Sequence, residues 1–246
     1  MDPFILATVG IAFLLGGVVK GVIGLGLPLT SVAVMSTVLD LRVAIPLLVI
    51  PVTVTNVWQA LRGGRLIELL ALYWPMLVAA AIGVWVGTLA LYRVDPSLLL
   101  VLLGVVVCGY ALINLIAVEI AFSPRHVRVV SPMVGLVSGL LSGTTGSLGL
   151  PIVIYLQGLG LAKDVLVQAM GIQFFTTGVV WTAALFDQRG INAGNLPISA
   201  LALVPAVAGM IAGQWLRERL SPERFRFWLF VFLFAVGLNL IRKGLF

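Results

Sequence analysis

Residues 21–28 read GVIGLGLP, and residues 143–151 read GTTGSLGLP. Both stretches are rich in glycine and both end in Leu-Pro, so a helix that runs into either of them is interrupted there. Proline is favoured in the first turn of a helix, where its missing N–H group costs nothing. We therefore expect a new helix to begin near Pro28 and another near Pro151.

Three further matches follow these stretches in the same order along the chain. Val57-Trp58 recurs as Val180-Trp181, Pro75, Gly83 and Trp85 recur as Pro205, Gly213 and Trp215, and Asn114-Leu115-Ile116 recurs as Asn239-Leu240-Ile241. One match would arise by chance among so many Leu, Val and Gly residues, but an ordered series indicates an internal two-fold repeat. The sequence predicts a first repeat over residues 1–118, a basic connecting loop over residues 119–130 and a second repeat over residues 131–246.

The composition of the chain places both repeats in a membrane. Of the 246 residues, 61% are hydrophobic and 10% are charged, with a mean hydropathy of +1.18, whereas a soluble domain carries about 25% charged residues. Uncharged windows of about 20 residues, enough to cross the hydrocarbon core, alternate with charged loops. The first window lacks the basic start and cleavage pattern of a signal peptide. We predict an all-α polytopic protein of the cell inner membrane, surrounded by the lipid bilayer.

The positive charges predict how the chain crosses the membrane, because Lys and Arg gather in cytoplasmic loops. If each broken segment crosses once, the 14 positive charges outside the breaks divide seven against seven between the two sides. If each folds back as a hairpin, ten of the 15 lie on one side. The ten are Lys20, Arg62, Arg65, Arg125, Arg128, Lys163, Arg217, Arg219, Arg224 and Arg226, and the five on the other side are Arg42, Arg93, Arg189, Arg242 and Lys243. We therefore predict two inverted repeats, each a glycine/proline-broken hairpin followed by three transmembrane helices.

The two broken stretches are candidates for a substrate site. The arm that follows each proline has about 11 residues and a length of about 16 Å, half the hydrocarbon thickness, so the tips of inverted hairpins can meet near the midplane. Lipid offers no partners to backbone N–H groups at such a break, and free N–H groups at a helix start suit an anion. The alternative is close helix packing through small residues. The predicted substrate-binding residues of the two breaks are Gly21, Gly24, Gly26 and Pro28, with Ser142, Gly143, Thr144, Thr145, Gly146, Ser147, Gly149 and Pro151.

Further polar residues lie within the expected spans. Thr53 and Asn56 are one turn apart on the helix after the first hairpin, and Gln173, Thr176 and Thr177 lie on the equivalent helix of the second repeat. They either line the substrate site, as we predict, or join helices by hydrogen bonds. Lys20, whose repeat counterpart is Ser142, is a further predicted binding residue. Its ammonium group is a counter-charge for an anion if the tip is buried and otherwise extends to the membrane interface.

The duplicated glycine-rich stretches ending in proline, the small hydrophobic chain and the basic central loop resemble the sulfite exporter TauE/SafE family of bacterial membrane permeases. The resemblance covers essentially the whole chain and places family motif positions at Gly21, Gly24, Gly26 and Pro28 and at Gly143, Gly146, Gly149 and Pro151. It implies transport of small sulfur-containing anions such as sulfite or organosulfonates. We therefore expect a secondary transporter, most simply an exporter, that works by alternating access at a midplane site between the two tips. The alternative is an anion channel or a membrane scaffold without carrier activity.

The reactive residues argue against an enzyme. The chain has one histidine, His126, among loop charges, one cysteine, Cys108, and no Asp or Glu in the middle of a span. Such a set offers neither a nucleophile–base pair nor a metal-ligand cluster. We expect no catalytic residue, no metal, no cofactor and no nucleic acid partner. A small anion is the expected substrate, and the oligomeric state is left open.

The charge distribution yields a topology prediction. Both termini should lie on the periplasmic side, and the loop over residues 119–130 should be cytoplasmic. A cysteine introduced at the C-terminus should react with an impermeant thiol reagent in intact cells, while one introduced in the loop should react only after permeabilisation. The reverse labelling pattern would contradict the inverted topology.

Overall fold

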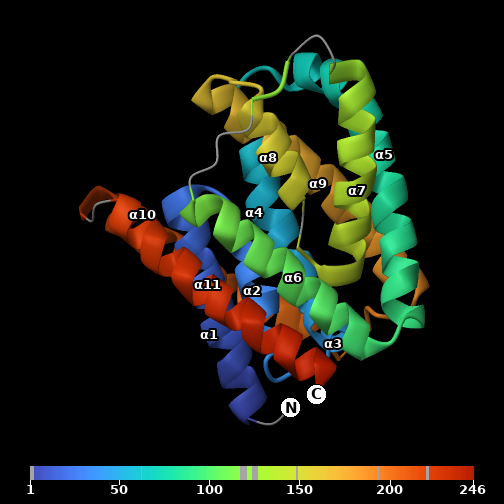
Figure 1. Ribbon diagram of the computed structural model, residues 1–246, viewed down its shortest axis with the longest axis vertical. Helices are drawn as coiled ribbons and strands as arrows, with labels where there is room; N and C mark the ends of the chain where they lie inside the picture. The colour runs from blue at the N-terminus through green and yellow to red at the C-terminus, as the bar shows by residue number, and fades with distance from the viewer. Residues whose placement is uncertain are drawn as a thin grey trace. The chain divides into compact units, whose positions relative to one another are not determined.

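The computed structural model describes residues 3–61, 63–116, 121–123, 127–147, 149–192, 194–219 and 222–246 (Figure 1). Over these ranges its regular elements are helices. In chain order they are α1 (Pro3–Ile23), α2 (Leu27–Met35), α3 (Leu41–Ala44), the 3-10 helix η1 (Ile45–Leu48), α4 (Val49–Leu61), α5 (Leu66–Arg93), α6 (Pro96–Leu115), α7 (Val127–Thr145), α8 (Leu150–Gly158), α9 (Lys163–Asp187), α10 (Leu196–Arg219) and α11 (Pro222–Leu245). Within the described part, eight helical segments are long and apolar enough to cross a membrane, α3, η1 and α4 forming one of them. The prediction of an all-helical polytopic membrane protein is confirmed.

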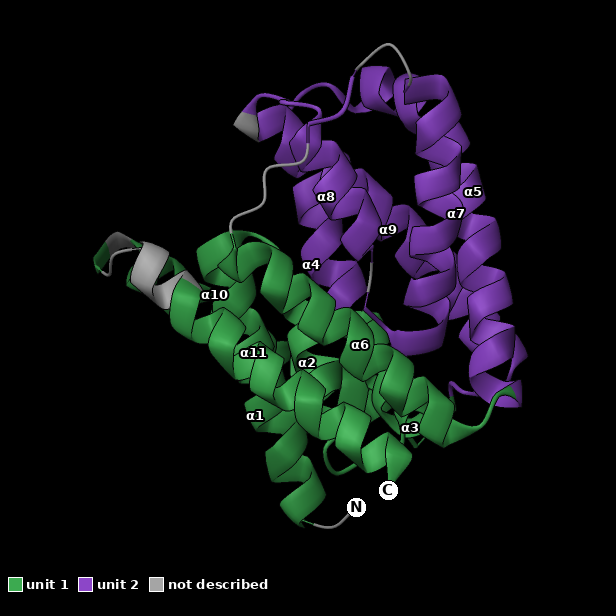
Figure 2. Ribbon diagram, viewed as in Figure 1, with its two compact units in different colours: residues 1–51, 94–118, 192–246 green, residues 52–93, 119–191 purple. Residues whose placement is uncertain are grey.

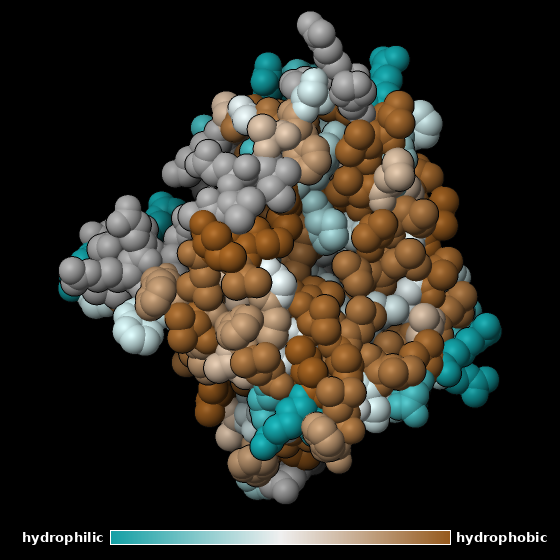
Figure 3. Space-filling view, in the orientation of Figure 1, coloured by the Kyte–Doolittle hydropathy of each residue, from teal (hydrophilic) through white to brown (hydrophobic). Residues whose placement is uncertain are grey.

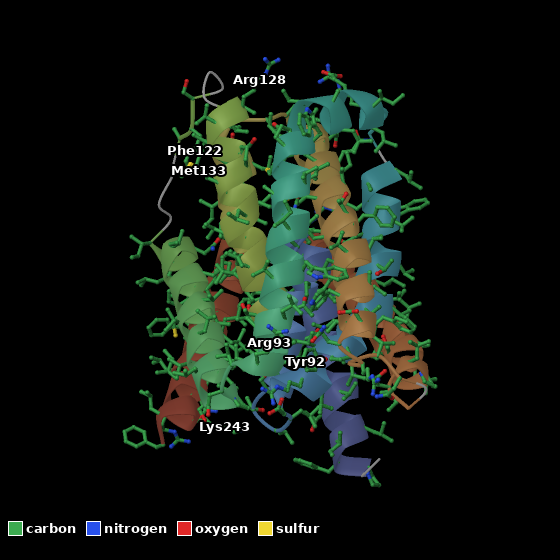
Figure 4. All side chains as sticks on the ribbon, turned by 90° about the vertical axis from the view of Figure 1, so that its right-hand side faces the viewer. Tyr92, Arg93, Phe122, Arg128, Met133 and Lys243 are labelled. Atoms are coloured by element: carbon green, nitrogen blue, oxygen red, sulfur yellow. The ribbon has the colours of Figure 1, made fainter. Side chains whose placement is uncertain are left out.

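Charged residues lie at helix ends, as expected if the helix middles face lipid. The Asp40 carboxylate accepts the Arg42 N–H at 2.7 Å and begins α3, and Asp95 accepts the Ser97 N–H at 2.8 Å and begins α6. A carboxylate is favourable at a helix N-terminus because it satisfies free N–H groups. Arg93 and Lys243 lie at the last turns of α5 and α11 (Figure 4).

Both glycine–proline stretches fold back as hairpins. In the first, the Ser31 hydroxyl of α2 donates to the Ala12 carbonyl of α1 at 3.1 Å, and Gly16 of α1 faces Leu27 at the start of α2. In the second, the N–H groups of Gly149 and Ile152 donate to serine hydroxyls of α7. Each second arm, α2 or α8, has nine residues, too few to span the bilayer. These contacts give the hairpins, while the inverted orientation of the repeats stays a prediction.

The structure divides into two compact units, each built from helices of both repeats (Figure 2). Unit 1 comprises residues 1–51, 94–118 and 192–246, and unit 2 comprises residues 52–93 and 119–191. Unit 1 thus contains α1, α2, α3, η1, α6, α10 and α11, and unit 2 contains most of α4 with α5, α7, α8 and α9. The spatial units therefore do not follow the sequence repeats. Residues 119, 120 and 124–126 of the basic loop, including Arg125 and His126, lie outside the described residues.

Each unit is organised around one pair of parallel helices in glycine contact. In unit 1, Gly17 and Gly21 of α1 lie against the backbone of α10 near Ala206 and Met210. In unit 2, Gly83 of α5 lies against the backbone of α7 near Leu136. In repeat positions, α1 corresponds to α7 and α10 to α5, so each unit makes the same contact with the repeats exchanged. A glycine at these points lets two backbones approach closely, which is a main source of helix association in lipid.

Helices α6 and α11, which occupy equivalent positions in the two repeats, pack against each other in unit 1. Gly104 of α6 lies against Gly237 of α11, and Gly244 near the end of α11 lies against Ser97 near the start of α6. Since contacts advance along one helix as they recede along the other, the two helices are antiparallel.

Apolar side chains cover the outward faces of the helices, with polar groups at the helix ends (Figure 3). Val204 and Ile211 on α10 are 69% and 63% exposed, and Met133 on α7 is 66% exposed. Patches of this kind are excluded from the surfaces of soluble monomers. They fit a surface that faces lipid.

The glycine contacts predict a pair of variants with different stability. Gly17→Ala would place a Cβ against the Ala206 carbonyl and should lower the free energy of unfolding by about 1–3 kcal/mol, as expected for overpacking. Gly10→Ala lies on the same helix, with no atom within 4 Å of the added Cβ. Melting temperatures of the purified proteins in detergent should fall only for the first variant, and equal values would remove the packing role from Gly17.

Candidate functional site

The two breaks have the same backbone conformation. Four glycines adopt left-handed φ angles: Gly24 (+87°) and Gly26 (+100°) in unit 1, and Gly146 (+69°) and Gly149 (+78°) in unit 2. The Gly24 N–H donates to the Lys20 carbonyl at 2.8 Å, and the Gly146 N–H donates to the Ser142 carbonyl at 2.9 Å. Pro28 and Pro151 lie in the first turns of α2 and α8 as predicted. Glycine is required here because other residues rarely adopt these φ angles.

The predicted glycines fall into two structural classes. A Cβ on Gly21 would collide with the Met210 carbonyl, and one on Gly143 would collide with the Val84 carbonyl. Close packing, the alternative considered from the sequence, therefore suffices to explain these two. Gly24 is different, because no protein atom lies within 4 Å of the position its Cβ would take. Its left-handed backbone borders open space.

Hydroxyl groups complete the break in unit 2. The Ser142 hydroxyl donates to the Ser138 carbonyl at 2.7 Å and accepts the Gly149 N–H at 2.9 Å, while the Ser138 hydroxyl accepts the Ile152 N–H at 3.4 Å. The hydroxyls of Thr145 and Ser147 are 2.8 Å apart, and the Thr144 hydroxyl donates to the Leu140 carbonyl at 2.9 Å. All five side chains are buried. In this structure their hydrogen-bonding capacity serves the hairpin itself.

The break in unit 1 carries a buried lysine instead. Lys20 is 7% exposed, and its role as a counter-charge for an anion stays a prediction. It lies in the last turn of α1, at the repeat position of Ser142. The nearby Thr30 of α2 is fully buried, and its hydroxyl has no hydrogen-bond partner in the described part of the chain. Without Lys20, the loop charges still divide nine against five, so the predicted orientation is unchanged.

Helices α4 and α9 place the other predicted residues in unit 2. Asn56 and Thr177 are buried and Thr53 and Thr176 are half-buried. Gln173 is fully buried, and neither atom of its amide has a hydrogen-bond partner among the described residues. An unsatisfied buried polar group costs about 1–3 kcal/mol, so this amide is a strong candidate for contact with a solute. It directly precedes Phe174, whose ring lies against Gly149 of the break.

Two glutamines in the same helices have a structural role. The Gln59 amide donates to the Val167 carbonyl at 3.1 Å, and the Gln168 amide donates to the Ala60 carbonyl at 3.2 Å. These reciprocal bonds join α4 to α9 at a point where Gly171 lies against the backbone of Ala60. The inter-helix hydrogen bonding considered from the sequence is thus observed for this pair.

The sequence did not single out Thr30 or Tyr155, whose hydroxyls are buried without a partner among the described residues. The indole N–H of Trp181 has the same property. Its repeat counterpart Trp58 is 65% exposed, whereas Trp181 is fully buried. The two tryptophans occupy equivalent positions in the sequence repeats, but their surroundings in the structure differ. No group of three His, Cys, Asp or Glu side chains occurs within the described ranges.

Comparison with known proteins adds one match. A family model described as "Sulfite exporter TauE/SafE" matches residues 9–240, nearly the whole chain. No curated protein and no solved structure matches the chain.

The serine contacts of unit 2 predict a second pair of variants. Ser142→Ala leaves the Gly149 N–H without its acceptor and should destabilise the protein by about 1–3 kcal/mol. Ser131→Ala is the control on the same helix, because the Ser131 hydroxyl is buried without a partner in the described residues and its removal should leave stability equal or higher. Thermal unfolding in detergent measures both, and a neutral Ser142→Ala would contradict the capping role.

Proposed function

Because the chain belongs to the sulfite exporter TauE/SafE family of membrane transporters, we propose that it is a secondary transporter of small sulfur-containing anions such as sulfite or organosulfonates. The family match includes both glycine–proline breaks. One observation supports these breaks as the place of substrate binding. In both hairpins left-handed glycines interrupt a helix and a proline lies in the first turn of the next one, so N–H groups at that helix start have no acceptor within the helix.

An oxyanion suits such a break for a physical reason. Its oxygens accept hydrogen bonds and cannot donate them when ionised, so they complement N–H groups, hydroxyls and an ammonium group. In unit 1, Gly24 offers backbone beside open space and Lys20 offers positive charge. In unit 2, taken by itself, Gln173 offers an unpaired amide. The proposed binding residues remain those predicted from the sequence, with Gly21 and Gly143 shaping the breaks by packing.

We propose further that the repeats are inverted and that transport proceeds by alternating access. Two observations support this. The repeat-equivalent helices α6 and α11 are antiparallel in unit 1, as equivalent helices of inverted repeats must be. The loop charges also divide unequally, as the positive-inside rule requires for this topology. Inverted repeats allow two related conformations that open to opposite sides of a membrane.

Export is the direction that the membrane potential favours. A negative cell interior drives an anion outward by about 2.3 kcal/mol per charge at 100 mV. The Asp and Glu residues that the structure describes lie at helix ends or loops, so no carboxylate in the described spans is positioned to carry a proton. We propose that efflux of the anion needs no coupling ion.

Counterflow in proteoliposomes tests the function. Vesicles loaded with unlabelled sulfite should accumulate radiolabelled sulfite, with saturation at high concentration, and an imposed inside-negative potassium–valinomycin potential should accelerate efflux at equal pH. Non-saturating flux would identify a channel, and absence of flux for sulfite and organosulfonates alike would identify a scaffold. Efflux that follows a pH gradient and ignores the potential would rule out potential-driven export.

A matched pair of glycines tests the place of binding. Gly24 and Gly160 both have left-handed φ angles and no atom within 4 Å of an added Cβ, but Gly160 follows α8 at the end away from the break. Asparagine tolerates this backbone conformation. Gly24→Asn should fold and lose at least tenfold in sulfite counterflow, because its side chain fills the open space, while Gly160→Asn should transport normally. Equal counterflow in the two variants would remove Gly24 from the site.

A further inference from the structure

Both breaks contain left-handed glycines followed by a proline in the first turn of the next helix. They differ in the side chains that face the N–H groups at the start of that helix. In unit 2, Ser138 and Ser142 accept the N–H groups of Ile152 and Gly149 at the start of α8. Counting along the repeats from the matched glycines and prolines, the equivalents in unit 1 are Gly16 and Lys20 on α1, facing Leu29 and Gly26 at the start of α2. Glycine has no side chain, and a lysine ammonium group has donors but no acceptor. Neither residue can cap the N–H groups that the serines cap in unit 2.

The side chain of Lys20 emerges on the face of α1 that packs on α2. Gly16, one turn earlier, faces Leu27 and Ser31 of α2, and residues four apart share a helix face. In unit 2 the equivalent serine reaches the Gly149 N–H directly. Lys20 is only 7% exposed, so protein encloses most of its side chain.

Two further features of unit 1 indicate room and donors for a ligand. The Thr30 hydroxyl is fully buried without a partner in the described residues. Thr30 follows Gly26 by one turn, with its N–H donating to the Gly26 carbonyl at 3.0 Å, and helix side chains point toward the N-terminus, so its hydroxyl is aimed at the break. The position beside Gly24 is free of protein atoms within 4 Å of a Cβ.

From these contacts we propose that the anion charge of the substrate is held at the unit 1 break, by the Lys20 ammonium group, the Gly26 and Leu29 N–H groups and the Thr30 hydroxyl, while the unit 2 break is a self-capped copy. This inference rests on the proposed function and specifies it. The ligand class is a monovalent or divalent oxyanion, such as sulfite or an alkylsulfonate. Three kinds of donor would hold it, and hydrogen bonds from an ammonium group to an oxyanion are among the stronger ones in proteins.

The test introduces into the unit 1 break the serine hydroxyl that caps the unit 2 break. Lys20→Ser installs in unit 1 the residue that caps unit 2, so it should fold with an unchanged or higher melting temperature and lose at least tenfold in apparent affinity for sulfite in counterflow. Ser138→Ala leaves the Ile152 N–H of unit 2 without its acceptor, so it should lower the melting temperature but keep sulfite affinity within twofold. Methanesulfonate should compete with sulfite in the wild type at least tenfold better than dimethyl sulfone, its uncharged analogue, and this preference should vanish in Lys20→Ser.

Each result bears on one of the two proposals. Saturable sulfite counterflow that survives Lys20→Ser with affinity within twofold, or that is lost in Ser138→Ala, would overturn the assignment to unit 1 and leave the transport function standing. Wild-type vesicles without counterflow of any sulfur anion would overturn both. If Lys20→Ser does not fold, Thr30→Val removes only the buried hydroxyl at constant shape. A severalfold loss of sulfite affinity supports the site, and unchanged affinity contradicts it.

Discussion

A backbone N–H group inside a lipid bilayer has no water to bond, and leaving it unpaired costs several kcal/mol. Regular helices meet this constraint everywhere except where the chain must leave helical geometry. In the described part of the chain there are two such places, one at Gly24 and Gly26 and one at Gly146 and Gly149, where left-handed glycines separate a long helix from a nine-residue arm. Everything near the breaks follows from how those few N–H groups are satisfied. Serine hydroxyls do so in unit 2, and an ionised solute is the partner we assign in unit 1.

The constraint also explains the packing around the breaks. A short arm cannot cross the membrane, so it must be enclosed by protein, and the long helix beside it needs a neighbour in close contact. Gly17 and Gly21 let α1 approach α10, and Gly139 and Gly143 let α7 approach α5. In each unit, the long helix that precedes the break therefore packs against a helix of the other repeat. The boundaries of the two compact units therefore differ from the boundaries of the two sequence repeats.

Much of the fold could be predicted because its signals are local. Glycine and proline mark both breaks within a few residues, uncharged windows locate the spans, and Asp40 and Asp95 mark helix starts. The arms α2 and α8 each have nine residues, somewhat fewer than the predicted length of about 11. The prediction could not separate Gly21 from Gly24, since close packing and access for a solute both require a missing Cβ. That distinction depends on which atoms lie opposite each glycine in the folded protein. The sequence pattern does not contain this information.

The same limit applied to the polar residues of the breaks. From the sequence, Ser142, Thr144, Thr145 and Ser147 add donors for a substrate, whereas their hydroxyls bond within the hairpin. One signal could have indicated this, because Ser138 and Ser142 lie four residues apart on a helix that ends at the break and so share one face. Their absence from the first repeat, where Gly16 and Lys20 stand, is visible in the sequence once the repeats are aligned.

That difference has a consequence for how a repeated architecture handles a small anion. Two identical breaks would present two equal sets of N–H groups, and an anion bound equally well by both would gain little from leaving either. Filling one set with serine hydroxyls removes the competition, and placing a cation beside the other concentrates the attraction in one location. A carrier must bind its substrate tightly enough to select it and loosely enough to release it, so a single charged contact with neutral surroundings is a workable compromise. Under the proposed function, the symmetry of the backbone serves the conformational change, and the divergence at four positions, Gly16, Lys20, Ser138 and Ser142, serves recognition.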